Sequence, residues 1–495
     1  EGKKFYWEAK YQKSNKALEK AVKHDPKFTM AYRRMAINYG YLGQLKQKKE
    51  YNLKALELID RVSERERYLI LGAACELENP PQKCIKNLQE FLEYYPDDEQ
   101  GRSSLGAIYR NLEMWEEAEG QFWNVLKLNH KHQITYFNLV YIYFARGMYS
   151  EAKIILQKNK NIFPILDRYH RYMAHIFLFN RDYNLALLEV EKAFAQDPKN
   201  DANTELEGNI RHIKGDFGKA EDAYKELISS TNRNSQPKGC LLMSNLYLLN
   251  GKFERCKEEV NLGLKFCEKS SLEEDRAGLL CHKAYLNLRL NDKEAALTAL
   301  NDAVKAIEEL GFMDYYSITI KKFAVHLKGW SYLQMNKMKE AKDTANQLDR
   351  LIRDTGNLKQ RRLYYRLMGL ICAKEGEIKK AIGYFEKAIP LLSYQVNDWD
   401  NRAFYLAPLA SAYYRIKNFE KAKELYKEIQ SLTMGRLRWG DIYTRSFYRL
   451  GKIYQYMGKA REAKDNYIEF LRLWKDADSG MSEIEDVQKQ LTLIR

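Results

Sequence analysis

The sequence lacks most of the features that accompany catalysis or insertion into a membrane. Its 495 residues include only nine prolines, no H-E-x-x-H pattern, no paired Cys/His set and no glycine-rich phosphate loop. No apolar run approaches the roughly 18–20 residues of a membrane span, and no basic-then-apolar signal peptide is visible at the N-terminus. We therefore expect a non-catalytic protein without a membrane span, a metal centre or a cofactor.

Cysteine is also sparse, with seven residues and no C-x-x-C pair. Five of them, at positions 75, 84, 240, 256 and 372, occupy places where the pattern described below has small or apolar side chains. Buried free cysteines behave as small core residues. We predict reduced thiols and a cytoplasmic location, because disulfides are rare in reducing compartments.

What the chain does have is a repeated pattern, which is clearest between Asp98 and Lys199. A small residue, an aromatic, an alanine and a second apolar residue recur with a fixed period of about 34 residues. The three copies are Gly106/Tyr109/Ala118/Phe122, Val140/Tyr143/Ala152/Leu156 and Ala174/Phe177/Ala186/Val190. Apolar spacing of three and four residues, interrupted by a short polar turn, predicts two antiparallel helices in each unit.

The residue types follow from how two such helices pack. Small residues at positions such as Gly106 and Ala118 let the helix axes come close, whereas the aromatic residues fill the space between units. Four of the nine prolines, Pro26, Pro96, Pro164 and Pro198, follow the second helix of a unit, where a helix should stop. This pattern resembles the tetratricopeptide repeat, which implies a right-handed α-solenoid with a concave groove.

The repeat continues through almost the whole chain, but its period changes. Seven units of about 34 residues, the first of them truncated, cover residues 1–235, and the stretch from Ser229 to Gly239 has loop composition. Six units with a period of about 40–45 residues cover residues 236–480. Residues 481–495 should form a capping helix, because terminal units must cover an open apolar end. We predict an all-α solenoid of about 13 hairpins, with longer helices and a wider groove in the second half.

The charge balance bears on the partners of the protein. Lys and Arg outnumber Asp and Glu by 82 to 67, which gives a formal net charge of +15. A mosaic of solvated helix faces accounts for this balance, and an anionic partner is the alternative interpretation.

In the resembled family the first helix of each unit forms the inner wall. Two groups of residues on this predicted wall combine aromatic rings with charged or polar side chains, as a peptide anchor requires. The middle cluster consists of Phe137, Tyr141, Arg168, Arg171, His175, Glu205, Asn209 and His212. The terminal cluster consists of Tyr414, Arg445, Tyr448 and Lys452. These twelve residues are the predicted groove residues, although each aromatic could equally close the inner core.

Further resemblances narrow the functional hypotheses. The segment 443–478 and the N-terminal segment 1–32 resemble C-terminal repeat arrays of bacterial multidomain receptors, in which a Ser/Thr kinase, nucleotide cyclase or winged-helix head precedes the array. We accordingly expect an effector domain upstream of residue 1. The carboxylate clamp of groove-type cochaperones matches at only two of its five positions, Asn138 and Arg168, and is not carried over.

The leading hypothesis is therefore a protein- or peptide-binding scaffold or sensor segment of a signalling or regulatory protein. The longer units also resemble ligand-sensing arrays of maltose-regulator-type activators and pheromone receptors, which implies a small-molecule or peptide sensor. RNA binding, as in interferon-induced repeat proteins, is the third hypothesis, which the basic charge and interleaved aromatics favour.

Overall fold

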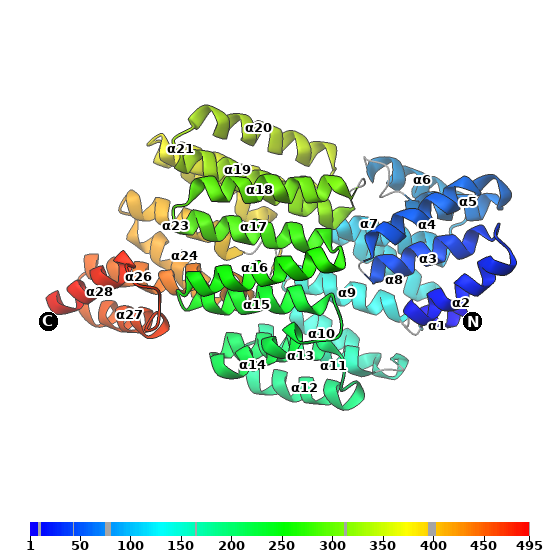
Figure 1. Ribbon diagram of the computed structural model, residues 1–495, viewed down its shortest axis with the longest axis horizontal. Helices are drawn as coiled ribbons and strands as arrows, with labels where there is room; N and C mark the ends of the chain where they lie inside the picture. Colours follow the sequence, from blue (N-terminus) through cyan, green and yellow to red (C-terminus); the bar gives the residue numbers. More distant parts are fainter. Residues whose placement is uncertain are drawn as a thin grey trace.

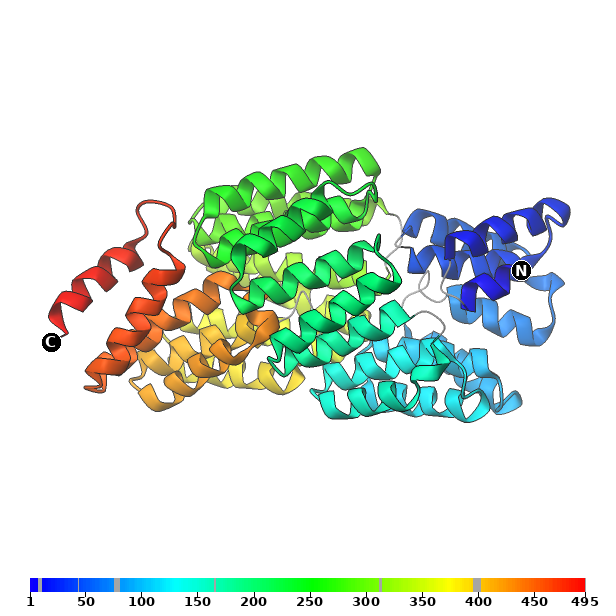
Figure 2. The ribbon, with the colours of Figure 1, turned by 90° about the horizontal axis from the view of Figure 1, so that it is seen from below.

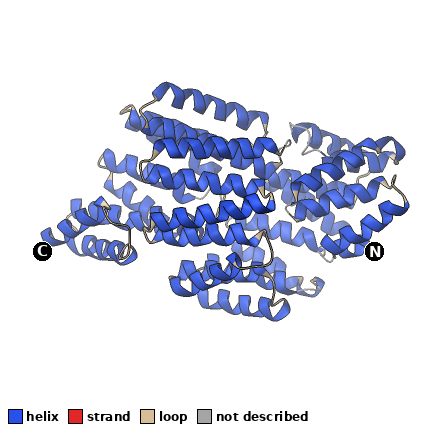
Figure 3. Cartoon of the chain, viewed as in Figure 1, coloured by secondary structure: helices blue, strands red, loops and turns tan. Residues whose placement is uncertain are grey.

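The chain is all helical in its computed structural model, which describes residues 1–7, 11–42, 44–74, 81–163, 166–310, 314–394 and 402–494. No strand occurs in these ranges (Figure 3). Cys75 and Pro164, which the sequence pattern singled out, lie outside the described residues. The predicted all-α solenoid is confirmed.

Seven helical hairpins make up the first half of the described chain. Each pairs two antiparallel helices, of roughly three to four turns except for the six-residue α1, as the short period of the first half implies. Their bounds are α1 (Gly2–Trp7), α2 (Tyr11–His24), α3 (Thr29–Tyr41), α4 (Leu45–Glu57), α5 (Glu64–Ala74), α6 (Pro81–Tyr94), α7 (Glu99–Asn111), α8 (Trp115–Leu128), α9 (Gln133–Ala145), α10 (Tyr149–Lys158), α11 (Leu166–Phe179), α12 (Tyr183–Gln196), α13 (Asp201–Lys214) and α14 (Phe217–Ile228).

The second half contributes six hairpins with longer helices, a short inserted helix and a terminal helix. Helices α16 to α20 have 17 to 20 residues each. The bounds are α15 (Ser235–Leu249), α16 (Phe253–Ser270), α17 (Glu273–Arg289), α18 (Lys293–Glu309), α19 (Tyr315–Gln334), α20 (Met338–Asp354), α21 (Arg361–Lys374), α22 (Ile378–Ala388), α23 (Arg402–Arg415), α24 (Phe419–Ser431), α25 (Thr433–Arg438), α26 (Gly440–Tyr456), α27 (Ala460–Leu473) and α28 (Ser482–Leu493).

Glycine and aromatic residues meet where the two helices of a hairpin cross. A Cβ atom added to Gly106 would lie 2.9 Å from the ring of Phe122, and one added to Gly451 would lie 2.4 Å from the ring of Tyr467. Both rings are completely buried. This close approach confirms the packing role that the repeat pattern predicted for the small residues.

The hairpins stack into a superhelix in which units distant in the sequence come into contact. Figures 1 and 2 show the N-terminal and C-terminal units at opposite ends of the long axis, with the units between them winding around it. In the first half, Tyr11 on α2 hydrogen-bonds with Arg168 on α11. In the second half, the Thr444 hydroxyl on α26 donates to the Leu249 carbonyl at the end of α15, at 2.8 Å.

The prediction of a wider groove in the second half is wrong. Its inner face is filled by the chain's own side chains, because α26 packs against α15 and hydrogen-bonds to α17. The Tyr285 hydroxyl donates to Asp441 at 2.9 Å, the Phe404 and Trp439 rings stack at 4.6 Å, and the Arg366 guanidinium lies 3.4 Å from the centre of the Phe404 ring. The longer helices therefore build a closed, packed turn and not a wider opening.

Two local predictions also need correction. The loop expected from Ser229 to Gly239 is shorter, because α15 already begins at Ser235 and has Pro237 in its first turn, where the missing N–H of proline costs no helical hydrogen bond. The prediction of reduced thiols is wrong at Cys84, which is disulfide-bonded. The other five cysteines in the described residues are buried free thiols.

Candidate functional site

A pocket of about 490 Å³ lies between the first helices of four successive units and α25. Helices α9, α11, α13 and α15 form its wall. The lining residues of each helix are mostly three or four positions apart, because this spacing places them on one helix face. Its volume is within the range of about 300–1,000 Å³ typical of ligand sites. It is lined by Tyr141, Phe144, Arg168, Arg171, Tyr172, His175, Phe179, Ala202, Glu205, Leu206, Asn209, Lys238, Leu241, Leu242, Asn245, Met434, Leu437 and Arg438.

Aromatic rings from α9 and α11 form one side of this concave pocket. Phe144 and Phe179 pack edge to face with their ring centres 5.1 Å apart, and Tyr172 lies 6.1 Å from Phe144. Such ring pairs are stiff and add apolar contact area at little entropic cost. This side of the pocket can hold an apolar or aromatic group of a ligand.

Cationic side chains also line the pocket, and two of them, Arg168 and Arg171, lie on α11 beside these rings. Arg168 stacks on Phe137, with its guanidinium carbon 4.3 Å from the ring centre. Arg171 donates to Asp167 at 3.3 Å, but its buried Nε has no hydrogen-bond partner among the described residues. Burial lowers the pKa of Arg171 from its ordinary value, and the nearby Asp167 partly offsets this. Unused donor capacity on a buried arginine favours an anionic or carbonyl-bearing ligand.

Two polar residues on α13 and α15 complete the wall. Glu205 is the one carboxylate in the lining and forms an ion pair with Lys238 at 2.7 Å. Asn245 is buried, and its Oδ1 has no hydrogen-bond partner among the described residues. The wall thus offers an unused acceptor as well as unused donors, which suits a ligand with both N–H and carbonyl or carboxylate groups, such as a peptide.

Six of the eight predicted middle-cluster residues line the pocket, and two do not. Phe137 is buried behind Arg168 and stacks on Tyr172 and Phe163, with 5.0 Å between ring centres in each pair. His212 is completely buried, near Tyr224. Burial lowers the pKa of His212 to about 3, so the imidazole is neutral at physiological pH. Phe137 supports the pocket from behind, whereas His212 belongs to the core.

The predicted terminal cluster lies mainly beneath the last helix. Arg445 forms ion pairs with Asp441 at 3.0 Å and with Glu483 on α28 at 2.8 Å. Lys452 and Tyr448 both donate to Asp486 on α28, at 3.0 and 2.7 Å. Tyr414 instead contacts Phe419 and Tyr456. Arg445, Tyr448 and Lys452 therefore hold α28, and a ligand role for the terminal cluster stays an untested prediction.

Sequence reasoning missed the contribution of α25 to the pocket. Met434, Leu437 and Arg438 come from this six-residue helix between the twelfth and thirteenth hairpins. The spacing between Ala422 and Ala463 is the same as in the preceding unit, and this regularity hid the insertion. A signal was present in the run Leu432–Trp439, which adds apolar and basic residues after the second helix of its unit.

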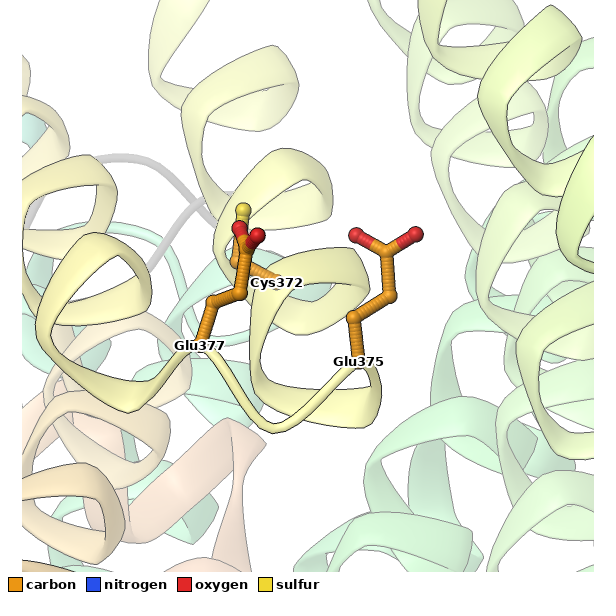
Figure 4. A group of neighbouring side chains, drawn as sticks. All are labelled: Cys372, Glu375 and Glu377. Atoms are coloured by element: carbon orange, nitrogen blue, oxygen red, sulfur yellow. The ribbon is translucent and has the colours of Figure 1, made fainter.

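One group of side chains has the composition of a metal site. Cys372, Glu375 and Glu377 lie at the turn between α21 and α22, with ligand atoms within 4.8 Å of one another (Figure 4). Each carboxylate is already neutralised, because Glu375 pairs with Lys342 at 2.6 Å and Glu377 with Lys380 at 2.9 Å. We therefore assign no metal to this turn.

One stretch of the chain matches a known family. Residues 444–473, which are most of α26 and all of α27, match the family model of the tetratricopeptide repeat. The chain thus carries a tetratricopeptide repeat by sequence, within a stack of helical hairpins. Separately, none of the described helices is long and apolar enough to cross a membrane.

A relative and a solved structure are also similar to the chain. A TPR repeat-containing protein of Methanocaldococcus jannaschii is 22% identical over 406 residues, which are 78% of this chain and 65% of that protein. The chain therefore spans about two thirds of the length of this curated relative. A chain in the crystal structure of the APC/C hetero-tetramer Cut9-Hcn1 aligns over 99% of this chain and 94% of its own length, with 13% identity and a TM-score of 0.34.

Proposed function

We propose that this protein is a non-catalytic scaffold that binds a segment of a partner protein in the pocket between α9, α11, α13, α15 and α25. The observation that carries the proposal is the composition of that pocket. Four aromatic rings and four cationic side chains line it, with a single carboxylate among them. A short acidic segment with an aromatic anchor matches this wall in both charge and shape.

We further propose that the scaffold serves a larger signalling or regulatory protein and acts in the cytoplasm. The five buried free thiols support a reducing compartment, and the Cys84 disulfide counts against it. A repeat array presents a continuous concave face to a partner and needs no reaction chemistry of its own. The same pocket would also serve a sensor of short peptides or small molecules, because its volume is that of a ligand site.

The direct test is binding of an array of acidic-aromatic pentapeptides, such as Glu-Asp-Phe-Glu-Asp, followed by fluorescence anisotropy on the tightest sequence. We expect the Arg171→Ala/Tyr141→Ala variant to bind at least about tenfold more weakly, because charge-assisted and aromatic contacts are lost. The matched control is Arg233→Ala, since Arg233 is exposed in the loop before α15. Thermal unfolding should be unchanged in all three proteins.

Two outcomes would contradict the proposal. Equal peptide affinity in the pocket variant and the control would place binding elsewhere on the array. Preferential binding of single-stranded oligouridylate, with an affinity that falls steeply as salt rises, would favour the RNA-binding hypothesis instead, because phosphate contacts release counterions.

A further inference from the structure

A second pocket, of about 390 Å³, lies between the N-terminal units and the start of α19. Its wall comes from the first helices α3, α5 and α7, and residues 314–316 close it from the second half of the chain. It includes none of the residues that line the pocket of the proposed function. Four cationic side chains, Arg33, Arg34, Lys48 and Arg110, face it, against the single carboxylate of Asp314.

The central feature of this N-terminal pocket is a buried guanidinium that pairs with neutral acceptors. Arg33 is only 3% exposed, and it donates to the Leu69 carbonyl at 2.8 Å and to the Gln100 side-chain oxygen at 3.4 Å. It forms no ion pair with any carboxylate in the described part of the chain. Burial of a charge is costly unless an opposite charge compensates it.

Two neighbouring arginines, Arg34 and Arg110, also interact with uncharged groups. Arg34 stacks on Tyr6, with its guanidinium carbon 4.1 Å from the ring centre, and Arg110 donates to Asn138 at 2.6 Å and to Asn111 at 2.9 Å. Neither pairs with a carboxylate among the described residues. Burial, together with the charge of Arg34, lowers the pKa of Arg33 to about 10. Lys48 pairs with Asp314 at 3.9 Å. The positive charge of the three arginines therefore lacks a neutralising carboxylate among the described residues.

Neutral donors complete the lining. Ser103 and Ser104 on α7 border the pocket, and neither hydroxyl hydrogen-bonds to a described side chain or backbone group. Hydroxyl groups and guanidinium forks together match the oxygen atoms of a tetrahedral oxyanion, whereas a lone carboxylate would leave much of this positive charge unbalanced.

We propose that the N-terminal pocket binds a phosphate monoester, carried either by a phosphorylated side chain of a partner or by a small phosphorylated molecule. The dianion supplies the negative charge that Arg33, Arg34 and Arg110 lack. The volume exceeds that of a phosphate group alone, so the pocket also accommodates part of the group to which the phosphate is attached. This site is independent of the proposed peptide pocket.

The test is isothermal titration of the full chain with inorganic phosphate, with chloride at matched ionic strength as the reference. We expect the Arg34→Gln/Arg110→Gln variant to bind phosphate at least about tenfold more weakly, because two charge-assisted contacts are lost. These two arginines are less buried than Arg33, so the variant keeps the fold, which circular dichroism verifies. Arg233→Gln and Arg171→Gln should bind phosphate as the wild type does.

The two sources of the phosphate are separated by a second pair of probes. Tighter binding of the peptide Ala-Gly-phosphoserine-Gly-Ala than of inorganic phosphate and free O-phosphoserine supports a phosphorylated partner, and the reverse order supports a small ligand. The proposal is overturned if phosphate binds no better than chloride, or if the Arg34→Gln/Arg110→Gln variant binds as tightly as the wild type. A loss of phosphate binding in Arg171→Gln alone would also overturn it, because the anion would then occupy the other pocket.

Discussion

Glu113 and Arg362 form a buried, two-pronged ion pair between residues 249 positions apart in the chain. The guanidinium Nη1 and Nη2 donate to the two carboxylate oxygens at 2.8 and 2.9 Å. Glu113 lies in the turn between α7 and α8, and Arg362 lies at the start of α21. Asn357 adds a hydrogen bond to the same carboxylate at 3.0 Å. A turn of the first half is thereby fixed to the interior of the second half.

Replacement of Glu113 by Gln should lower the free energy of unfolding by about 3–5 kcal/mol, because it leaves the Arg362 charge buried without its partner. Both side chains are almost inaccessible, with 2% or less of each exposed, so water cannot replace the lost carboxylate. Urea denaturation followed by circular dichroism measures the change. Glu117→Gln is the matched control, since Glu117 is exposed on α8. A loss below about 1 kcal/mol would show that the pair contributes no more than a surface salt bridge.

Lys322 should make stability depend on pH in the alkaline range. It is 1% exposed and donates to Gln360 at 2.6 Å, and burial lowers the pKa of its ammonium to about 7. Between pH 7 and the ordinary lysine pKa of about 10.4, the unfolded chain holds a proton that the folded chain has released. Stability contributed by this residue therefore rises with pH across that window, by up to about 1.4 kcal/mol per pH unit, and is constant below pH 7.

The measurement is urea denaturation of wild type and Lys322→Met at pH 7, 8 and 9. The free energy of unfolding of the wild type should increase relative to that of Lys322→Met as pH rises. A pH-independent difference would show that Lys322 titrates normally in the folded protein.

The helical hairpin could be predicted because residues close together in the sequence determine it. Gly106 and Phe122 lie on the two helices of one hairpin, and Gly451 and Tyr467 have the same separation in sequence. Helical periodicity alone places each pair at one helix crossing. The inner wall was predicted from the resembled family, in which first helices form it. Tyr141, Arg171 and Glu205, which that resemblance placed on the wall, line the pocket.

The path of the superhelix could not be predicted in this way. Small rotations between successive units accumulate, and they decide which distant residues meet, such as Thr444 and Leu249. Closure of the second half depends on such contacts, and so do the position of α25 in the pocket and the ion pair of Arg445 with Glu483 on α28. A pattern that repeats within one unit carries no information about them.

Docking of α28 should protect the last hairpin from hydrogen exchange. Val487 is the one completely buried side chain of this helix among the described residues, and Asp486 and Glu483 accept hydrogen bonds from α26. Val487→Asp should raise amide exchange in α26 and α27 by at least about tenfold, because an unpaired charge cannot stay at that position. Binding of the acidic pentapeptide should be unaffected. Reduced peptide binding in this variant would instead indicate that the terminal cluster contributes to the ligand site.

A bulky side chain at position 202 should block the proposed peptide pocket from inside. Ala202 is part of the lining on α13, at the N-terminal end of the helix and partly exposed to the pocket. Tryptophan at this position would project into open volume, so it should reduce affinity for the acidic pentapeptide by at least about tenfold without lowering the melting temperature. Ala107→Trp is the matched control, because Ala107 lines the N-terminal pocket on the equivalent helix of an earlier unit. Peptide affinity that survives Ala202→Trp but falls in Ala107→Trp would move the peptide site to the N-terminal units.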